Sequence, residues 1–229
     1  MQLSFFHTDP AEQRFVQISE AAMTDTPGPA AAISPRVYDW LSRIAGVGDA
    51  HWQLVAQAAV GAGATVLEVG VGTGNVLLKV KRAVPAAIAI GLDASTASLA
   101  TAARKAARAG VELQLDHCDA GHLPYPDATF DRVLSSFVLH HIPDDQQIAA
   151  LGEIRRVLKP DGSLHLLDFA AGPQPKSRIL AMLPGRRHHH GPQRPDLVEL
   201  MVQAGLTEPA RISEGASRLG RHAYYRASR

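Results

Sequence analysis

The chain has 229 residues, of which 46% are hydrophobic and 20% are charged, as is ordinary for a globular domain with a sizeable core. Its formal net charge of +1 argues against a nucleic-acid-binding surface, which normally carries a basic stripe. The single cysteine, Cys118, excludes an internal disulfide framework, and no apolar run approaches the roughly 20 residues of a membrane-spanning helix.

Residues 1–33 are the least regular part of the sequence, and we expect a partly flexible N-terminal extension. Glu12–Met23 favours a modest helix, which the Pro- and Gly-containing segment after it ends. No basic residue precedes the apolar patch Leu3–Phe6, so a secretory signal is not expected and the predicted location is cytoplasmic. The sequence leaves open whether translation starts at Met1 or Met23.

Two short helices are predicted before the first strand of the main domain. Ser34 followed by Pro35 is typical of a helix start, and this helix runs to about Ile44. Asp49 can cap a second helix that ends near Gly61–Gly63. We expect residues 34–62 to form a helical lid on a domain that spans residues 34–229.

A glycine-rich turn follows the first predicted strand of this domain. Thr65–Val69 is apolar apart from Glu68 and reads as a buried parallel strand. Glycines at alternate positions, Gly70, Gly72 and Gly74, then lead into a helix. Such a turn lets a ligand lie against the backbone near free N–H groups. The G-x-G-x-G spacing differs from the G-x-G-x-x-G that is typical of dinucleotide sites.

Strands and helices alternate after the glycine turn. Further predicted strands are Ala86–Leu92, Val111–Leu115, Phe130–Phe137 and Ser163–Leu167, and Lys159–Gly162 is a predicted turn. The predicted helices between them are Ser95–Ala109, which Gly110 ends, and Asp144–Leu158. This alternation predicts right-handed βαβ units, and therefore an α/β fold with a doubly wound, mostly parallel sheet.

The last quarter of the chain has a different composition. Residues 170–195 are rich in Gly, Pro, Arg and His and form a predicted loop on the substrate side. Asp196–Gln203 is a predicted helix. Arg211–Ser213 and His222–Arg226 are predicted strands that can pair as an antiparallel hairpin at the sheet edge.

Polar residues stand directly after several predicted strands, where open parallel sheets bind their ligands. Asp93 can accept hydrogen bonds from both hydroxyls of a ribose, or it can favour the start of the next helix. Asp119 and the N–H of Ala120 can together read the edge of an adenine, or Asp119 can make a local turn. Small polar residues such as Ser136 leave room for the rest of a ligand.

Four segments in this order and spacing resemble the class I S-adenosylmethionine-dependent methyltransferases. The segments are VLEVGVGTGN, GLDAS, DHCDAGHLPYPDATFDRVLSSFVLHHI and LKPDGSL, and the resemblance covers about residues 35–229. It implies a seven-stranded sheet of order 3-2-1-4-5-7-6 with an antiparallel seventh strand. It also implies S-adenosyl-L-methionine as the cofactor and S-adenosyl-L-homocysteine as the product.

The resemblance also implies roles for individual residues. The methionine and ribose side is lined by Glu68 and the three glycines, ribose is bound by Asp93 in the GLDAS segment, and Ser136 lies near the methionine moiety. Tyr38 is the aromatic residue of the lid that contacts the cofactor or packs the lid onto the domain. The predicted cofactor-binding set is Tyr38, Glu68, Gly70, Gly72, Gly74, Asp93, Ala94, Asp119, Ala120 and Ser136.

Methyl transfer from a sulfonium is an in-line displacement, so the protein mainly aligns the reactants. A base is needed only for an acceptor that is protonated at working pH, and His140 and His141 are the candidates, either as base or as substrate contact. They also have a structural reading. Three consecutive residues, His188–His190, cannot all face one ion, so no metal site is predicted. Cys118 reads as a packing residue.

The expected activity is methyl transfer to a small-molecule acceptor with an N, O or C nucleophile, without nucleic acid as a partner. The sequence identifies neither the acceptor nor the oligomeric state. The alternatives are an NAD(P)-dependent oxidoreductase on a similar fold, a non-catalytic cofactor-binding subunit, and aminopropyl transfer. The glycine spacing and the Asp119–Ala120 pair both count against a nicotinamide cofactor.

Overall fold

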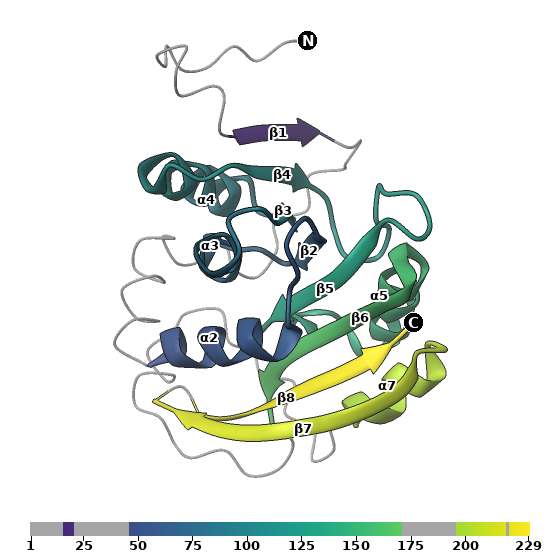
Figure 1. Ribbon diagram of the computed structural model, residues 1–229. Helices are drawn as coiled ribbons and strands as arrows, with labels where there is room; N and C mark the ends of the chain where they lie inside the picture. The colour runs from purple at the N-terminus through teal and green to yellow at the C-terminus, as the bar shows by residue number, and fades with distance from the viewer. Residues whose placement is uncertain (1–15, 21–45, 171–195, 219) are drawn as a thin grey trace.

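The computed structural model describes residues 16–20, 46–170, 196–218 and 220–229. They form an eight-stranded sheet of order β1-β4-β3-β2-β5-β6-β8-β7, with helices on both faces (Figure 1). The strands are β1 Val16–Glu20, β2 Thr65–Val69, β3 Ile88–Asp93, β4 Leu113–His117, β5 Phe130–Ser136, β6 Leu158–Phe169, β7 Thr207–Ser217 and β8 Gly220–Ser228. The helices are α2 Val47–Ala58, α3 Asn75–Ala83, α4 Thr96–Ala109, α5 Asp144–Val157 and α7 Leu197–Gln203, and a 3₁₀ turn spans Leu139–His141.

The predicted sheet order is confirmed. Counted from β2, the strands lie in the order 3-2-1-4-5-7-6, and β8, the seventh strand, runs antiparallel to both of its neighbours. The pairs among β2 to β6 are all parallel. The carboxyl ends of these strands therefore meet at one edge of the sheet, which is where a site is expected.

An eighth strand, β1, comes from the N-terminal extension, where the helix prediction over Glu12–Met23 is wrong. Residues Val16–Glu20 pair in parallel with β4, from Val16 opposite Leu113 to Glu20 opposite His117. The segment alternates apolar and polar residues with period two, as a strand does, and its backbone covers the hydrogen-bonding edge of β4. The helix prediction missed this period.

Most helix boundaries follow the residues predicted to set them. The Ser95 side chain accepts a hydrogen bond from the Ser98 N–H at 3.3 Å, and Gly110 ends α4 in the left-handed conformation. Asp196 caps α7 in the same way as Ser95 caps α4, through the Val198 N–H. For α2 the prediction is displaced, because the helix begins after Gly46 and Asp49 lies in its first turn. An acid at that position still favours the helix dipole.

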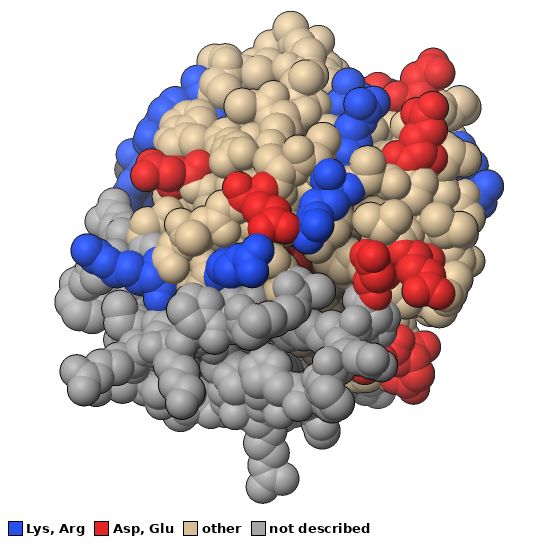
Figure 2. All heavy atoms as spheres, turned by 90° about the horizontal axis from the view of Figure 1, so that it is seen from below, with Lys and Arg blue, Asp and Glu red and all other residues tan. Residues whose placement is uncertain are grey.

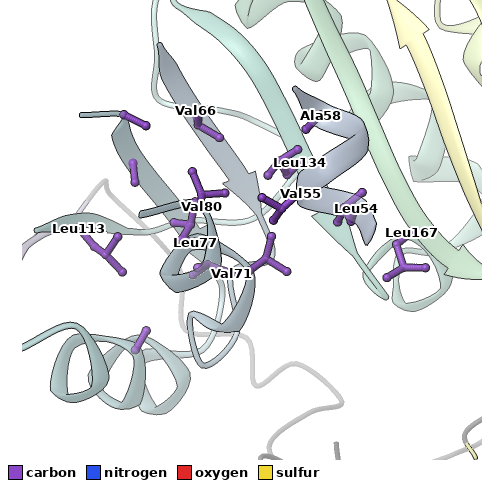
Figure 3. Packing of buried hydrophobic residues seen from close by; sticks show 14 of the residues in the cluster. Leu54, Val55, Ala58, Val66, Val71, Leu77, Val80, Leu113, Leu134 and Leu167 are labelled. Carbon is purple, nitrogen blue, oxygen red and sulfur yellow. The ribbon is translucent and has the colours of Figure 1, made fainter. Parts of the chain in front are cut away.

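Two hydrophobic cores pack against the two faces of the sheet. One core joins the sheet to α2, α3 and α4 (Figure 3), and the other joins it to α5 and α7. Val66 and Leu67 are adjacent in β2, are both fully buried and belong to opposite cores. Burial of each such side chain contributes roughly 1.5–3 kcal/mol. This two-sided burial explains why β2 is a nearly continuous apolar run.

The last strands, β6, β7 and β8, extend by several residues beyond their predicted bounds. β6 begins at Leu158, so Lys159–Gly162 is not a separate turn, and the pairing with β5 slips there as a bulge. A Cβ on Gly162 would come within 2.9 Å of two backbone oxygens, so the bulge needs glycine. β7 and β8 also continue into the predicted connection, because Glu214–Ser217 pair with β8 although small residues give little strand signal.

Candidate active site

The glycine turn between β2 and α3 is held in a conformation that requires glycine. Gly70, Gly72 and Gly74 all have positive φ. A Cβ on Gly70 would lie 2.3 Å from a methyl carbon of Val138, so the turn packs tightly against the end of β5. Among the described residues, nothing lies within 4 Å of a Cβ placed on Gly72. This part of the chain therefore leaves space above the centre of the turn, where a ligand can approach the backbone.

Asp93 connects the glycine turn to the start of α4. Its carboxylate accepts hydrogen bonds from the Gly72 N–H at 2.7 Å and the Ser95 N–H at 2.8 Å. Burial raises the pKa of Asp93, and these two hydrogen bonds oppose the shift. Asp93 therefore has the predicted role at the start of the next helix. Ribose binding is compatible with this role, because each carboxylate oxygen has a second lone pair.

Glu68 makes a structural contact. Its side chain is buried and accepts a hydrogen bond from the Leu77 N–H at 3.2 Å, in the first turn of α3. Burial raises its pKa well above the ordinary value, and the Leu77 N–H opposes this. Glu68 therefore holds the start of α3 against β2, and its contact with the methionine side of a cofactor stays a prediction.

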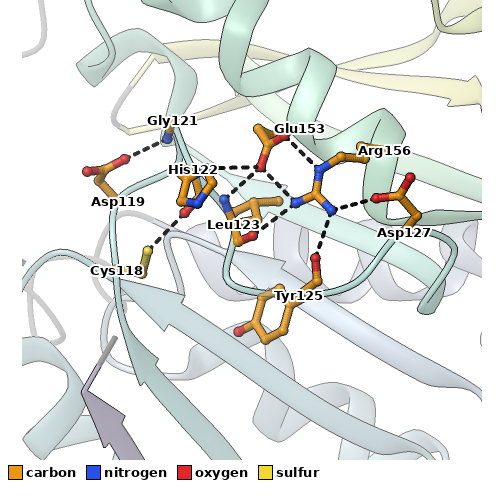
Figure 4. A network of polar contacts seen from close by, with 9 residues as sticks. All are labelled: Cys118, Asp119, Gly121, His122, Leu123, Tyr125, Asp127, Glu153 and Arg156. Atoms are coloured by element: carbon orange, nitrogen blue, oxygen red, sulfur yellow. Dashed lines mark hydrogen bonds and ion pairs between the residues drawn. The ribbon is translucent and has the colours of Figure 1, made fainter. Parts of the chain in front are cut away.

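The loop after β4 carries Asp119, whose side chain is exposed. Its carboxylate accepts a hydrogen bond from the Gly121 N–H at 2.7 Å, which is the local turn anticipated as the alternative to adenine binding (Figure 4). Ala120 packs against the core on the α5 side. Cys118 is buried and donates to the His122 carbonyl at 3.1 Å, as a packing residue would.

Arg156 of α5 fixes the rest of this loop. Its guanidinium donates to the carbonyls of Leu123 at 2.9 Å and Tyr125 at 2.8 Å (Figure 4). It also pairs with Asp127 at 2.8 Å and Glu153 at 2.7 Å, and these bonds raise the pKa of the guanidinium. The five donors of a guanidinium allow one side chain to make all these contacts. The proposed adenine-side loop is thus anchored to α5.

The end of β5 shows two features that are typical of functional sites. Ser136 Oγ is buried, and no hydrogen-bond partner lies within reach among the residues that the structure describes. The next residue, Phe137, has a φ of 57°, a strained value for a side chain of this size. Strain and an unsatisfied hydroxyl both lie beside the glycine turn, because β5 is the neighbour of β2.

The 3₁₀ turn places His140 against Asp168, at the end of β6. The His140 ring Nδ1 lies 2.8 Å from an Asp168 carboxylate oxygen, and the other oxygen accepts from the His140 backbone N–H at 3.2 Å. Both side chains are more than nine-tenths buried. The His141 ring lies 3.9 Å from that of His140, measured between centroids. Asp168 thus fixes the orientation of His140.

Two residues of this region were not selected from the sequence, Asp168 and His222. Asp168 follows the predicted strand Ser163–Leu167 directly, so the rule that selected Asp93 applies to it equally. His222 opens β8, opposite Phe169 of β6, because β8 runs antiparallel. That position became visible only with the strand register. Tyr38, His188–His190 and nearly all of the predicted loop 170–195 lie outside the described residues.

Within the described ranges, no group of three or more His, Cys, Asp or Glu side chains is placed to hold a metal ion. No helix in the described part of the chain is both long and apolar enough to cross a bilayer. On the face viewed from below, acidic and basic side chains of the described residues are interspersed (Figure 2).

The sequence matches known methyltransferases. Residues 66–162 match the family model described as "Methyltransferase domain". The chain is 39% identical over 145 residues to the demethylmenaquinone methyltransferase of Thermus thermophilus, covering 62% of this chain and 64% of that protein. It is 37% identical over 155 residues to the ubiquinone/menaquinone biosynthesis C-methyltransferase UbiE of Geobacter sulfurreducens, covering 64% and 57%. These matches span less than two thirds of either relative.

Solved structures share the fold at low sequence identity. Phosphoethanolamine N-methyltransferase 2 of Haemonchus contortus, in complex with S-adenosyl-L-methionine, has a TM-score of 0.67 at 16% identity, covering 85% of this chain and 56% of that one. A SAM-dependent methyltransferase of Aquifex aeolicus has a TM-score of 0.60 at 18% identity, covering 85% and 98%. With the strand order, these likenesses show that the chain has the fold of these methyltransferases, and its residues 66–162 match a methyltransferase domain.

Proposed function

We propose that the protein binds S-adenosyl-L-methionine at the carboxyl ends of β2 to β5 and transfers its methyl group to a small-molecule acceptor. One observation carries the proposal: Asp93 and Ser136 flank the glycine turn from the two strands beside β2, and the Ser136 hydroxyl has no hydrogen-bond partner among the described residues. A ligand with a ribose at one end and a polar tail at the other satisfies both groups. The open space above Gly72 admits it.

The chain's own residues then act by binding and alignment. Asp93 accepts from the ribose hydroxyls, Asp119 and the Ala120 N–H bind the adenine edge, and Ser136 bonds the methionine moiety. When bound, the cofactor supplies a methyl group that is already activated by the sulfonium. The remaining requirement is orientation, because alignment of the reactants can lower the activation free energy by about 7–11 kcal/mol.

His140 is the proposed residue for an acceptor that must lose a proton. Its Nδ1 is engaged by Asp168, so Nε2 is the ring nitrogen that can take a proton from an acceptor. In other enzymes, too, a carboxylate orients the ring of a histidine that acts as a base. His141 stacks on His140 and is the second candidate for substrate contact.

We further propose a hydroxylated aromatic acceptor, of the quinol type, as the first class to test. The names of the two relatives above point to this class. Aromatic rings also gather at the same edge of the sheet, where Phe137 lies 5.0 Å from Phe169 and 6.2 Å from His222 between ring centroids. Such rings favour a flat acceptor.

Thermal unfolding of the full chain with S-adenosyl-L-methionine, S-adenosyl-L-homocysteine and NAD tests the cofactor assignment. We expect the two adenosyl-sulfur compounds to raise the melting temperature and NAD to leave it unchanged. Stabilisation by NAD alone would favour the oxidoreductase alternative. Conversion of S-adenosyl-L-methionine to S-adenosyl-L-homocysteine with a panel of phenols, quinols and amines then tests catalysis. Binding without turnover of any acceptor would favour a non-catalytic subunit.

A further inference from the structure

A second concave feature lies between α2 and the β7–β8 hairpin. It is a cavity of about 640 Å³, within the range of small-molecule sites. Its lining comes from the first two turns of α2 and from the hairpin, and includes Asp49, Gln53, Ala216, Arg218, His222 and Tyr224. The start of α2 and the tip of the hairpin lie at the same end of the molecule (Figure 1).

This cavity borders the edge of the sheet where the strands of the proposed cofactor site end. His222 pairs with Phe169, the last residue of β6, so the start of β8 lies beside the end of β6. The His222 ring is edge-on to Phe137, which directly follows Ser136. A molecule in the cavity that lies against the His222 ring is therefore close to Phe137 and the end of β5.

The His222 ring is fixed by its neighbours, but one of its nitrogens makes no hydrogen bond to a described residue. The residue is only 4% exposed, yet its Nδ1 has no hydrogen-bond partner among the residues that the structure describes. Its Nε2 lies 3.5 Å from the Tyr224 hydroxyl, which donates to the Ala50 carbonyl at 3.2 Å. On the opposite strand, a Cβ on Gly215 would come within 2.5 Å of Nε2, so glycine is needed for the ring to fit.

A buried polar atom without a partner is destabilising, so a nitrogen beside a cavity with no partner among the described residues points to a ligand. Burial lowers the pKa of His222 and so favours the neutral form of its ring. A neutral imidazole offers one donor or one acceptor at Nδ1, depending on the tautomer. A hydroxyl group pairs with either tautomer.

We propose that this cavity is the binding site of the methyl acceptor, and that a hydroxyl of a flat aromatic acceptor bonds to Nδ1 of His222. The proposal rests on the proposed function. It makes His222 an acceptor-binding residue and assigns the β7–β8 hairpin to acceptor recognition. The His222 ring, in edge contact with Phe137, then lines the acceptor site beside the end of β5.

The test uses the full chain and 1,4-dihydroxynaphthalene, kept reduced under anaerobic conditions. Calorimetry measures S-adenosyl-L-homocysteine binding first and then dihydroxynaphthalene binding to that complex. His222→Phe keeps an aromatic ring but removes both nitrogens, whereas His222→Asn keeps a polar group near the position of Nδ1. We expect His222→Phe to weaken dihydroxynaphthalene binding about tenfold, the scale of one hydrogen bond, with a smaller loss for His222→Asn. Both variants should bind S-adenosyl-L-homocysteine within about twofold of the parent chain.

A second variant avoids the buried ring. Ala216 is exposed and lines the cavity, so Ala216→Trp should narrow the cavity and reduce dihydroxynaphthalene binding at least tenfold. Ala210→Trp is the matched control, because Ala210 is exposed on the same strand and is not among the lining residues. Unchanged dihydroxynaphthalene binding in Ala216→Trp, or no binding to the parent chain with S-adenosyl-L-homocysteine bound, overturns the acceptor proposal. Failure of S-adenosyl-L-homocysteine itself to bind overturns the proposed function instead.

Discussion

At the scale of single residues, the polar groups after the strands divide into those with a structural partner and those without. Glu68 and Asp119 each bond a nearby backbone N–H, so both have a structural role in the protein without ligand. Asp93 bonds two backbone N–H groups and keeps lone pairs for a ligand. Ser136 Oγ and His222 Nδ1 are buried without partners among the described residues. The last two therefore point most directly to ligands.

Asp93→Ala should weaken S-adenosyl-L-homocysteine binding by about 1–3 kcal/mol, because hydrogen bonds to a charged group are lost. The variant also loses the bond to the Ser95 N–H and so weakens the start of α4. The control is Ser95→Ala, which weakens the start of α4 through the side-chain cap and keeps Asp93. That change removes the α4 cap at a cost of about 1 kcal/mol of unfolding free energy and should leave the affinity unchanged. Calorimetry and urea unfolding separate the two effects. An unaltered affinity in Asp93→Ala would show that the ribose contact is misplaced.

Asp168→Asn tests the role proposed for His140. The amide keeps the shape of the side chain but cannot accept on both sides, so the His140 ring loses its fixed tautomer. If His140 takes a proton from the acceptor, turnover should fall about 10²-fold while S-adenosyl-L-homocysteine affinity stays the same. Steady-state rates over a pH series measure this, and the pH profile should also shift. Full turnover with reduced unfolding free energy would instead assign the pair a purely structural role.

At the scale of elements, what the sequence could predict depended on how local the signal was. The helix α4 could be bounded from Ser95 and Gly110, because both termini are set by backbone geometry at single residues. β1 was missed because Val16–Glu20 is short and becomes a strand by pairing with β4, about 100 residues away in sequence. The lengths of β7 and β8 likewise depend on the backbone pairing between these two strands. Asp93 and Ser136 could be found from strand ends alone, whereas His222 required the register of an antiparallel strand.

The loop after β4 is held by Arg156 together with Glu153 and the Tyr125–Asp116 hydrogen bond, and the Arg156 contacts can be tested by one substitution. Arg156→Ala removes the bonds to the carbonyls of Leu123 and Tyr125 and leaves these part-buried oxygens without their guanidinium donor. We expect a loss of about 2–3 kcal/mol in unfolding free energy and weaker binding of the adenosyl group. Arg155→Ala changes the same residue type one position earlier on the exposed side of α5 and should cost less than about 0.5 kcal/mol. Urea unfolding of both variants checks the difference, and equal losses would show that the network contributes little.

At the scale of the whole molecule, buried histidines link stability to pH. Burial lowers the pKa of His51 to about 3, helped by Lys79 and Lys105, and that of His165 to about 4, helped by Arg132 and Arg226. The unfolded chain takes up protons on these rings near the ordinary pKa of about 6.5, whereas the folded chain does not. Stability contributed by the neutral rings is therefore complete above about pH 6.5 and declines as the pH falls toward the folded values.

His165→Gln should flatten this dependence. Removal of one titrating ring should reduce the drop in unfolding free energy between pH 7.5 and pH 5 by about 1–2 kcal/mol. His122→Gln is the control, because the His122 side chain is 91% exposed. Urea unfolding at the two pH values measures both variants. An undiminished drop in His165→Gln would mean that its ring is not neutral in the folded protein.

The strands that cover β4 and β6, which are β1 and β8, have a consequence for the order in which the chain can complete its fold during synthesis. β1 has already left the ribosome when β4 emerges, so the outer edge of β4 can be paired at once. β6 has no such partner waiting, since the strand that covers it spans Gly220–Ser228. The nascent chain therefore exposes the β6 edge until nearly all of these 229 residues have emerged. Because His222 arrives with that strand, the proposed acceptor site is the last part of the described domain to form.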